Sequence, residues 1–148
     1  PDDEHQAARK RAQAEASLRG LCALVAEDNV SNQVLMLELL HDLGVGARLA
    51  RDGVEALRTL ENERFDFALV DIHMPEVNGD TVIRSLRAGS SPNAQIPVVV
   101  VTADAMKGFE ARFAEAGADA CISKPLDLDQ LTLAIRQAID AKRARDAA

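Results

Sequence analysis

Short, continuous apolar segments recur along the chain and are separated by longer segments of mixed polarity. The clearest of them are residues 21–26, 67–70, 96–101 and 120–122. Apolar segments of this length, without alternating polar residues, are typical of parallel strands that are buried on both faces of a sheet. A weaker segment at 47–50 alternates between apolar and polar residues, which predicts a strand at one edge of the sheet.

The segments between these strands have the periodicity of helices with one apolar face. The residues that share a face are, helix by helix, Leu35, Leu39, Leu40 and Leu43; Val54, Leu57 and Leu60; Val82, Ile83 and Leu86; Met106, Phe109 and Phe113; and Leu128, Leu131, Ile135 and Ile139. Strict alternation of strands and helices predicts a parallel sheet with right-handed crossovers and helices on both faces. The predicted fold is therefore a doubly wound α/β domain with five strands and five helices.

The two ends of the chain depart from this pattern. Residues 1–18 are rich in Ala, Arg, Glu and Gln but lack a wide apolar stripe, which predicts a helical or flexible linker outside the core. We expect the domain itself at residues 19–143 and a tail at 144–148. The start at Pro1, without a methionine, suggests a fragment of a longer protein or a processed chain.

Composition and charge narrow the classes of function. The formal net charge is −7 and aromatic residues make up 3% of the 148 residues, so a nucleic-acid-binding surface is not expected. No apolar segment is long enough to cross a membrane and no signal-peptide pattern is present, so we expect a cytoplasmic location without membrane contact. Cys22 and Cys121 lie in apolar segments, which predicts small buried side chains and neither a disulfide nor a zinc site.

Polar side chains collect where the predicted strands end. Glu27 and Asp28 follow the first strand, Asp71 ends the third, Thr102 ends the fourth, and Lys124 follows the fifth. In open parallel sheets, ligands bind outside the carboxyl ends of the strands, where the strand order switches. We therefore expect three carboxylates, one hydroxyl and one ammonium group to converge at that edge.

The chemistry of this set points to phosphoryl transfer. Three carboxylates in one crevice repel each other unless a cation joins them, and Mg²⁺ is the hard cation that such ligands suit. Lys124 and Thr102 could then contact phosphoryl oxygens, and a carboxylate nucleophile would give an acyl phosphate. Taken singly, Asp28 could be a helix cap, Thr102 a strand-end residue and Lys124 a surface lysine. The joint pattern at the ligand-binding edge favours the site.

Several stretches of the sequence resemble the receiver domains of bacterial two-component systems. They are 25–29 followed by Asn32, 69–75, 78–79, 101–108 and 117–125. The resemblance extends over about residues 21–141, and its details look most like the receivers of hybrid sensor histidine kinases. It implies a flavodoxin-like sheet with the strand order 2-1-3-4-5.

The resemblance also implies a role for each acidic residue. Asp71 would accept a phosphoryl group from a phosphohistidine. Asp28 and Asp71 would ligate Mg²⁺ directly, together with the backbone carbonyl of His73, while Glu27 would act mostly through a metal-bound water. A histidine kinase or a histidine phosphotransfer protein would be the donor, and a downstream phosphotransfer domain or output module would receive the signal.

The remaining site residues follow from the same resemblance. The Thr102 hydroxyl and the Lys124 ammonium group would each contact a phosphoryl oxygen, and the backbone N–H groups of His73 and Ala103 would complete the cradle. The Lys124–Pro125 bond is expected to be cis. The surface around the last two helices and the fifth strand is the candidate contact face, either for an output partner or for a homodimer.

One position departs from the family pattern. Many receivers carry a Tyr or Phe three residues before the lysine, and that aromatic side chain swings inward when the threonine moves. Here the position is Cys121, so we expect the signal to travel instead through the loop after Thr102 and the helix that bears Lys107 and Phe109.

His73 and Asp104, each two residues beyond a site residue, would set the lifetime of the phosphoryl group. His73 could equally be an exposed loop histidine.

Two other functions compete with a phospho-accepting receiver. A degenerate receiver would act as a phosphorylation-independent interaction module, and only Cys121 favours it. A phosphatase of the haloacid dehalogenase type would need a second acid two residues after the nucleophile, where this chain has His73. A receiver of this kind would catalyse its own phosphoryl transfer and dephosphorylation. The sequence does not decide whether it is an enzyme beyond that, or whether it is part of a hybrid histidine kinase.

Overall fold

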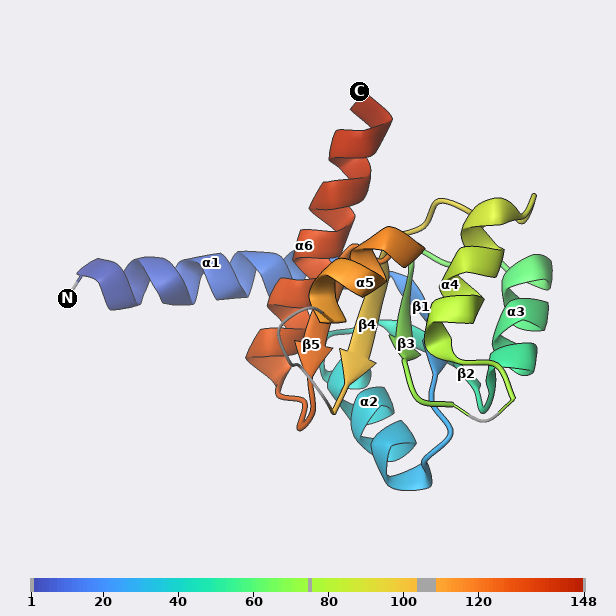
Figure 1. Cartoon of the computed structure of the whole chain (residues 1–148). Helices are drawn as coiled ribbons and strands as arrows, with labels where there is room; N and C mark the ends of the chain where they lie inside the picture. Colours follow the sequence, from blue (N-terminus) through green and yellow to red (C-terminus); the bar gives the residue numbers. More distant parts are fainter. Residues whose placement is uncertain (1, 75, 104–108, 148) are drawn as a thin grey trace.

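The computed structural model describes residues 2–74, 76–103 and 109–147, in which six helices and five strands occur (Figure 1). In chain order they are α1 (Asp2–Leu18), β1 (Cys22–Ala26), α2 (Val30–Asp42), β2 (Gly46–Ala50), α3 (Gly53–Asn62), β3 (Phe67–Asp71), α4 (Gly79–Ala88), β4 (Val98–Thr102), α5 (Phe109–Ala116), β5 (Ala120–Ser123) and α6 (Leu128–Ala147). Each strand is followed by a helix, as the hydrophobic pattern predicts, and α1 precedes the first strand.

The five strands form one parallel sheet in the order β2-β1-β3-β4-β5. This order confirms the predicted doubly wound, flavodoxin-like fold. The central strands β3 and β4 are buried at every residue, which explains their unbroken apolar sequences. The edge strand β2 is exposed over its first three residues, which explains its weaker pattern.

Two apolar cores lie on the two faces of the sheet. On one face α3, α4 and α5 pack against the strands through Leu60, Ile83 and Phe113 (Figure 1). On the other face α2 and α6 pack through residues that include Met36 and Ile135. Burial of a large apolar side chain contributes about 1.5–3 kcal/mol, so these two layers hold the sheet edges in place.

Two sequence-based predictions of burial are wrong. Cys22 is exposed because it is the first residue of β1, ahead of the buried part of the strand, and Cys121 is only half-buried because β5 is an edge strand. Val54 was predicted to share a buried face with Leu57 and Leu60, but α3 is rotated so that Ala56 and Leu60 are buried and Val54 is 40% exposed.

The terminal helices meet on one side of the domain. α1 ends at Leu18, which is fully buried in the core of the α2 and α6 face, although it belongs to the segment that was predicted to lie outside the core. The Arg136 guanidinium of α6 donates to Ser17 Oγ of α1 at 3.2 Å. Both helices then project from the domain (Figure 1). None of the described helices has the length and apolar character needed to cross a membrane.

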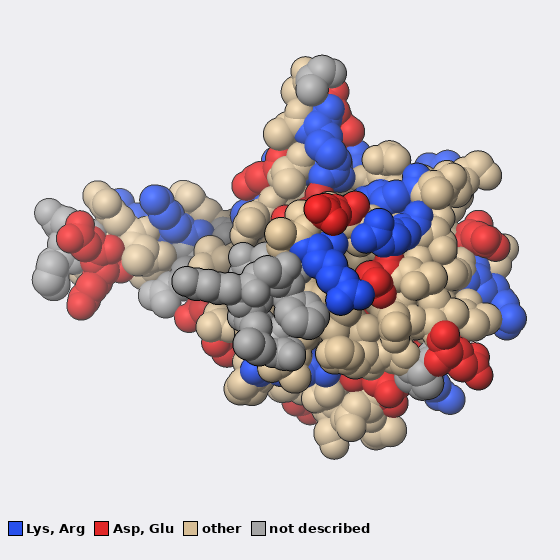
Figure 2. Space-filling view, in the orientation of Figure 1, with Lys and Arg blue, Asp and Glu red and all other residues tan. Residues whose placement is uncertain are grey.

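A mostly buried ion-pair network ties α4 to the end of α6. The guanidinium of Arg87, near the end of α4, donates to the carbonyls of Ala94 and Gly117 and to Asp119 Oδ2 at 3.1 Å. The Asp119 side chain, 4% exposed, also pairs with Arg145 in the last turn of α6. Figure 2 shows basic and acidic side chains side by side on the face of the molecule that carries α4 and α6.

The network generates the first prediction. Asp119→Ala removes the carboxylate that pairs with the Arg87 guanidinium, and it leaves the Val98 backbone N–H, which donates to Asp119 at 2.9 Å, without that acceptor. Breaking a buried pair in this way costs about 3 kcal/mol of unfolding free energy. Urea denaturation should show that loss. The matched control is Glu63→Ala, whose pair with Arg48 is exposed and should contribute less than about 1 kcal/mol. Equal effects of the two substitutions would contradict the prediction.

Candidate active site

Three carboxylates meet at the carboxyl edge of the sheet. The register places Ala26 opposite Val70, so Glu27 and Asp71, the residues that follow these two, lie on adjacent strand ends. Glu27 and Asp71 are 0% and 3% exposed, whereas Asp28 is exposed to solvent. Each of the three offers a carboxylate oxygen, and these oxygens all lie within 4.8 Å of one another.

Lys124 provides the positive charge beside this cluster. Its Nζ lies 3.2 Å from Asp71 Oδ2 and 3.4 Å from Glu27 Oε2. The Lys124 backbone N–H donates to the Thr102 carbonyl at 2.8 Å, which holds the loop after β5 against the end of β4. The peptide bond between Lys124 and Pro125 is cis, as the resemblance implies. Thr102, predicted as the hydroxyl donor, is fully buried at the end of β4.

The two carboxylate oxygens of Glu27 differ in their contacts: Oε1 accepts hydrogen bonds, whereas Oε2 has, within the described part of the chain, only the ion-pair contact with Lys124. Its Oε1 accepts hydrogen bonds from the Asn29 backbone N–H at 3.2 Å and from Asn32 Nδ2 at 3.3 Å. Its Oε2 is buried and has no hydrogen-bond partner within the described residues. Burial, reinforced by the negative charge of Asp71, raises the pKa of Glu27 above its ordinary value of 4.5.

These observations fit a divalent cation. The donor set of Glu27, Asp28 and Asp71 consists of oxygens only, which suits Mg²⁺. A buried carboxylate oxygen that lacks a hydrogen-bond partner is costly unless a cation or a bound water satisfies it. A metal at this point would supply that partner and would offset the repulsion that raises the pKa of Glu27.

The backbone around Asp71 is closely packed. The His73 N–H donates to Asp71 Oδ1 at 3.1 Å, while the His73 side chain is exposed. Behind Asp71, α4 begins at Gly79, where an added Cβ would lie 2.6 Å from the Asp71 carbonyl oxygen. Only glycine allows this approach, so α4 starts directly against the backbone of Asp71.

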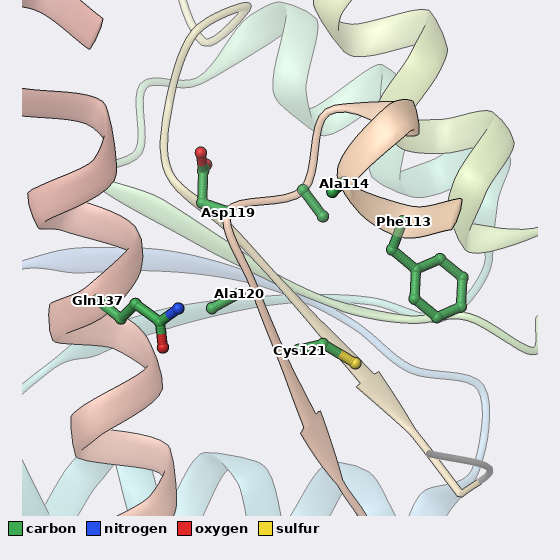
Figure 3. Close-up of a pocket in the computed structure, with 7 residues that line it drawn as sticks. Phe113, Ala114, Asp119, Ala120, Cys121 and Gln137 are labelled. Atoms are coloured by element: carbon green, nitrogen blue, oxygen red, sulfur yellow. The ribbon is translucent and has the colours of Figure 1, made fainter. Parts of the chain in front are cut away.

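The other predicted residues have three different outcomes. Ala103, predicted to supply a backbone N–H, is exposed at the end of β4. Asp104 and Lys107 lie outside the described residues. Cys121 is separate from the acidic cluster and, with Phe113 and Gln137, lines a groove of about 350 Å³ between α5, β5 and α6 (Figure 3).

Two residues that contact Glu27 have no assigned role in the sequence analysis. Asn32 contacts its carboxylate, and Gln33 Nε2 donates to its backbone carbonyl at 2.8 Å. Gln33 is a buried polar residue in an otherwise apolar helix face, and that is the signal by which it could have been found. Asn32 stands within a stretch that carries the resemblance, but its spacing alone does not reveal a contact with Glu27.

Comparison with known proteins identifies the family. The sequence pattern of the response regulator receiver domain matches residues 23–136. The chain is 36% identical over 122 residues to the sensor histidine kinase RcsC of Salmonella typhi. The aligned region covers 82% of this chain and 12% of that protein. It is 37% identical over 113 residues to the polar-differentiation response regulator DivK of Brucella anthropi, which covers 76% of this chain and 91% of that protein.

The chain belongs to the response regulator receiver family. The resemblance inferred from the motifs is confirmed, and the chain is a receiver domain of the two-component type and not a phosphatase of the haloacid dehalogenase type. This receiver spans only a small part of the sensor kinase relatives that it matches, 12% in the case of RcsC.

Solved structures agree with this assignment. The receiver domain of a sensor histidine kinase from Pseudomonas aeruginosa PAO1 superimposes with a TM-score of 0.74 and 30% identity, over 82% of this chain and 98% of that one. That crystal structure has a magnesium ion coordinated in its active-site cleft. Receiver domains bind Mg²⁺ in the active site, and the carboxylates of Glu27, Asp28 and Asp71 are consistent with such a site here.

The raised pKa of Glu27 generates the second prediction. Because the folded state holds the Glu27 proton more tightly than the unfolded state, stability without divalent cations falls as pH rises from about 4.5 through the raised pKa. Glu27→Gln removes this charge. In EDTA above that pH range, Glu27→Gln should therefore unfold at a higher temperature than the wild type.

The same variant should gain less from the metal. Thermal unfolding with added Mg²⁺ should raise the midpoint of the wild type more than that of Glu27→Gln, because the metal no longer relieves a buried charge. A Glu27→Gln variant that unfolds below the wild type in EDTA at pH 8 would contradict this account of Glu27.

Proposed function

We propose that this receiver accepts a phosphoryl group on Asp71 from a phosphohistidine, with Mg²⁺, and changes conformation to signal to a partner protein. The observation that carries the proposal is the position of Lys124 Nζ, 3.2 Å from Asp71 Oδ2, beside the three-carboxylate cluster. An acceptor carboxylate, a metal-ligand set and a cation for the phosphoryl oxygens are the parts that such a transfer needs.

The transfer is an in-line displacement at phosphorus. A carboxylate oxygen of Asp71 forms a bond to phosphorus as the bond between phosphorus and the imidazole nitrogen breaks, and the electron pair of that bond returns to the imidazole. Lys124, the Thr102 hydroxyl and the backbone N–H groups of His73 and Ala103 stabilise the charge on the three phosphoryl oxygens.

The metal site is built from this chain's own residues. Asp28 and Asp71, with the backbone carbonyl of His73, would hold Mg²⁺ directly, and Glu27 would hold one of its waters. Held by these residues, Mg²⁺ would supply positive charge to offset the negative charge of the phosphoryl group. Without a cation, the negative charge of Glu27 and Asp28 repels an incoming phosphoryl group.

A histidine kinase or a histidine phosphotransfer protein is the proposed donor. Several relatives are sensor histidine kinases. The receiver is proposed to act either as one domain of such a kinase or as the partner of a separate kinase. The surface of α5, β5 and α6, where Cys121 and Phe113 line a groove, is the proposed contact face for an output partner or a second copy of the chain.

The third prediction tests the acceptor. Incubation with acetyl phosphate and Mg²⁺ should add one phosphoryl group to the wild type, as measured by intact-protein mass spectrometry. Asp71→Ala should lose the label entirely, and chelation of Mg²⁺ should have the same effect on the wild type. The control is Asp42→Ala, which removes an exposed carboxylate at the end of α2. A wild type that takes no label would instead support the degenerate receiver.

The fourth prediction concerns the lifetime of the phosphoryl group. His73 and Asp104 are proposed to flank the path of the hydrolytic water, so His73→Ala and Asp104→Ala should each change the rate of dephosphorylation severalfold. The rate is followed after removal of acetyl phosphate. Unchanged rates in both variants would show that neither residue sets the lifetime.

A further inference from the structure

The first turn of α2 surrounds Glu27 with hydrogen-bond donors. Asn32 Nδ2 and the Asn29 backbone N–H donate to Glu27 Oε1, and Gln33 Nε2 donates to the Glu27 carbonyl at 2.8 Å. Gln33 is 8% exposed, so this contact is shielded from water. Both the backbone and the side chain of Glu27 are therefore fixed by the N-cap residue and the first turn of α2.

These contacts decide which carboxylate oxygen faces the site. The terminal torsion of a glutamate side chain is soft, so an unrestrained carboxylate would sample many orientations. With Oε1 engaged by two donors, Oε2 is the buried oxygen that lies toward Lys124 and has no hydrogen-bond partner among the described residues. Ligand groups held in this way lose less freedom when a cation binds.

We propose that Asn32 is a positioning residue for Mg²⁺ binding, which acts by orienting the Glu27 carboxylate. The inference rests on the proposed function, because it assumes that the carboxylate cluster holds a metal. Asn32 itself needs no contact with the ion or with the phosphoryl group. Gln33 supports the same arrangement by holding the Glu27 backbone.

The role of Asn32 in the helix cap is separate from this one. The cap of α2 is made by Asn29, whose Oδ1 accepts from the Asn32 backbone N–H at 3.0 Å. Asn32→Ala removes only the side chain and leaves that backbone donor in place. Alanine also has a higher helix propensity than asparagine, so the substitution should not lower the stability of α2.

Isothermal titration calorimetry with Mg²⁺ alone tests the proposal. Asn32→Ala should weaken Mg²⁺ binding by roughly tenfold, the usual effect of removing a residue that orients a metal ligand. The control is Asn62→Ala on α3. The Asn62 side chain is exposed and donates to the Arg58 carbonyl, so this variant should bind Mg²⁺ as the wild type does. Asn32→Gln, which keeps an amide donor, should recover part of the affinity.

A double-mutant cycle separates this role from a general loss of structure. If Asn32 acts through Glu27, then Asn32→Ala in a Glu27→Gln background should weaken Mg²⁺ binding by less than twofold. The thermal midpoint of Asn32→Ala in EDTA should equal or exceed that of the wild type. If the two substitutions lower the Mg²⁺ affinity independently, so that their effects multiply, the proposal is overturned. It is also overturned if the Asn32→Ala variant binds Mg²⁺ as tightly as the Asn62→Ala variant does.

The outcomes also distinguish this inference from the proposed function. If the wild type binds Mg²⁺ with the predicted dependence on Asn32 but takes no label from acetyl phosphate, the positioning role stands and the phosphoryl transfer fails. If the wild type is labelled on Asp71 but Asn32→Ala leaves Mg²⁺ affinity unchanged, the positioning role fails alone. A wild type that binds no Mg²⁺ overturns both.

Discussion

The fold is organised around two carboxylates that lie side by side beneath the protein surface, where burial and mutual repulsion both oppose their negative charges. Glu27 and Asp71 are both buried, and the ammonium group of Lys124 lies within 3.4 Å of each. One cation cannot balance three neighbouring carboxylates, and the pKa of Glu27 is raised by its burial first and by the negative charge of Asp71 second. The site is thus destabilising to the protein by itself, and its ligands relieve that destabilisation. Functional sites commonly trade stability for binding in this way.

The rest of the fold serves to bring these charges together. Parallel strand register aligns the ends of β1 and β3, and the pairing of β5 with β4, continued by the backbone hydrogen bond from Lys124 to the Thr102 carbonyl, brings Lys124 to the same edge. The two apolar layers fix the sheet from either face. The residues of the site come from segments far apart in sequence, so their geometry depends on the whole sheet and not on any local motif.

The sequence predicts the sheet and the composition of its edge because both follow from local rules. Buried parallel strands have continuous apolar sequences, and the residues that follow them must share one edge. The sequence does not predict which side chains are exposed, because that depends on how each helix and strand is oriented in the fold. The rotation of α3 decides that Val54 is exposed, and the edge position of β5 leaves Cys121 half-buried. The contact of Asn32 with Glu27 and the pairing of Asp119 likewise join residues whose proximity no sequence pattern encodes.

Helix α4 contacts the end of β3 at its first residue and is linked to the C-terminal helix α6 through Asp119 at its other end. Its first residue, Gly79, touches the backbone of Asp71, and Arg87 near its end shares the Asp119 carboxylate with Arg145. A rigid rod fastened at both ends transmits displacement along its axis. Any displacement of α4 that followed a change at Asp71 would therefore also act on the ion pairs that Asp119 makes with Arg87 and Arg145.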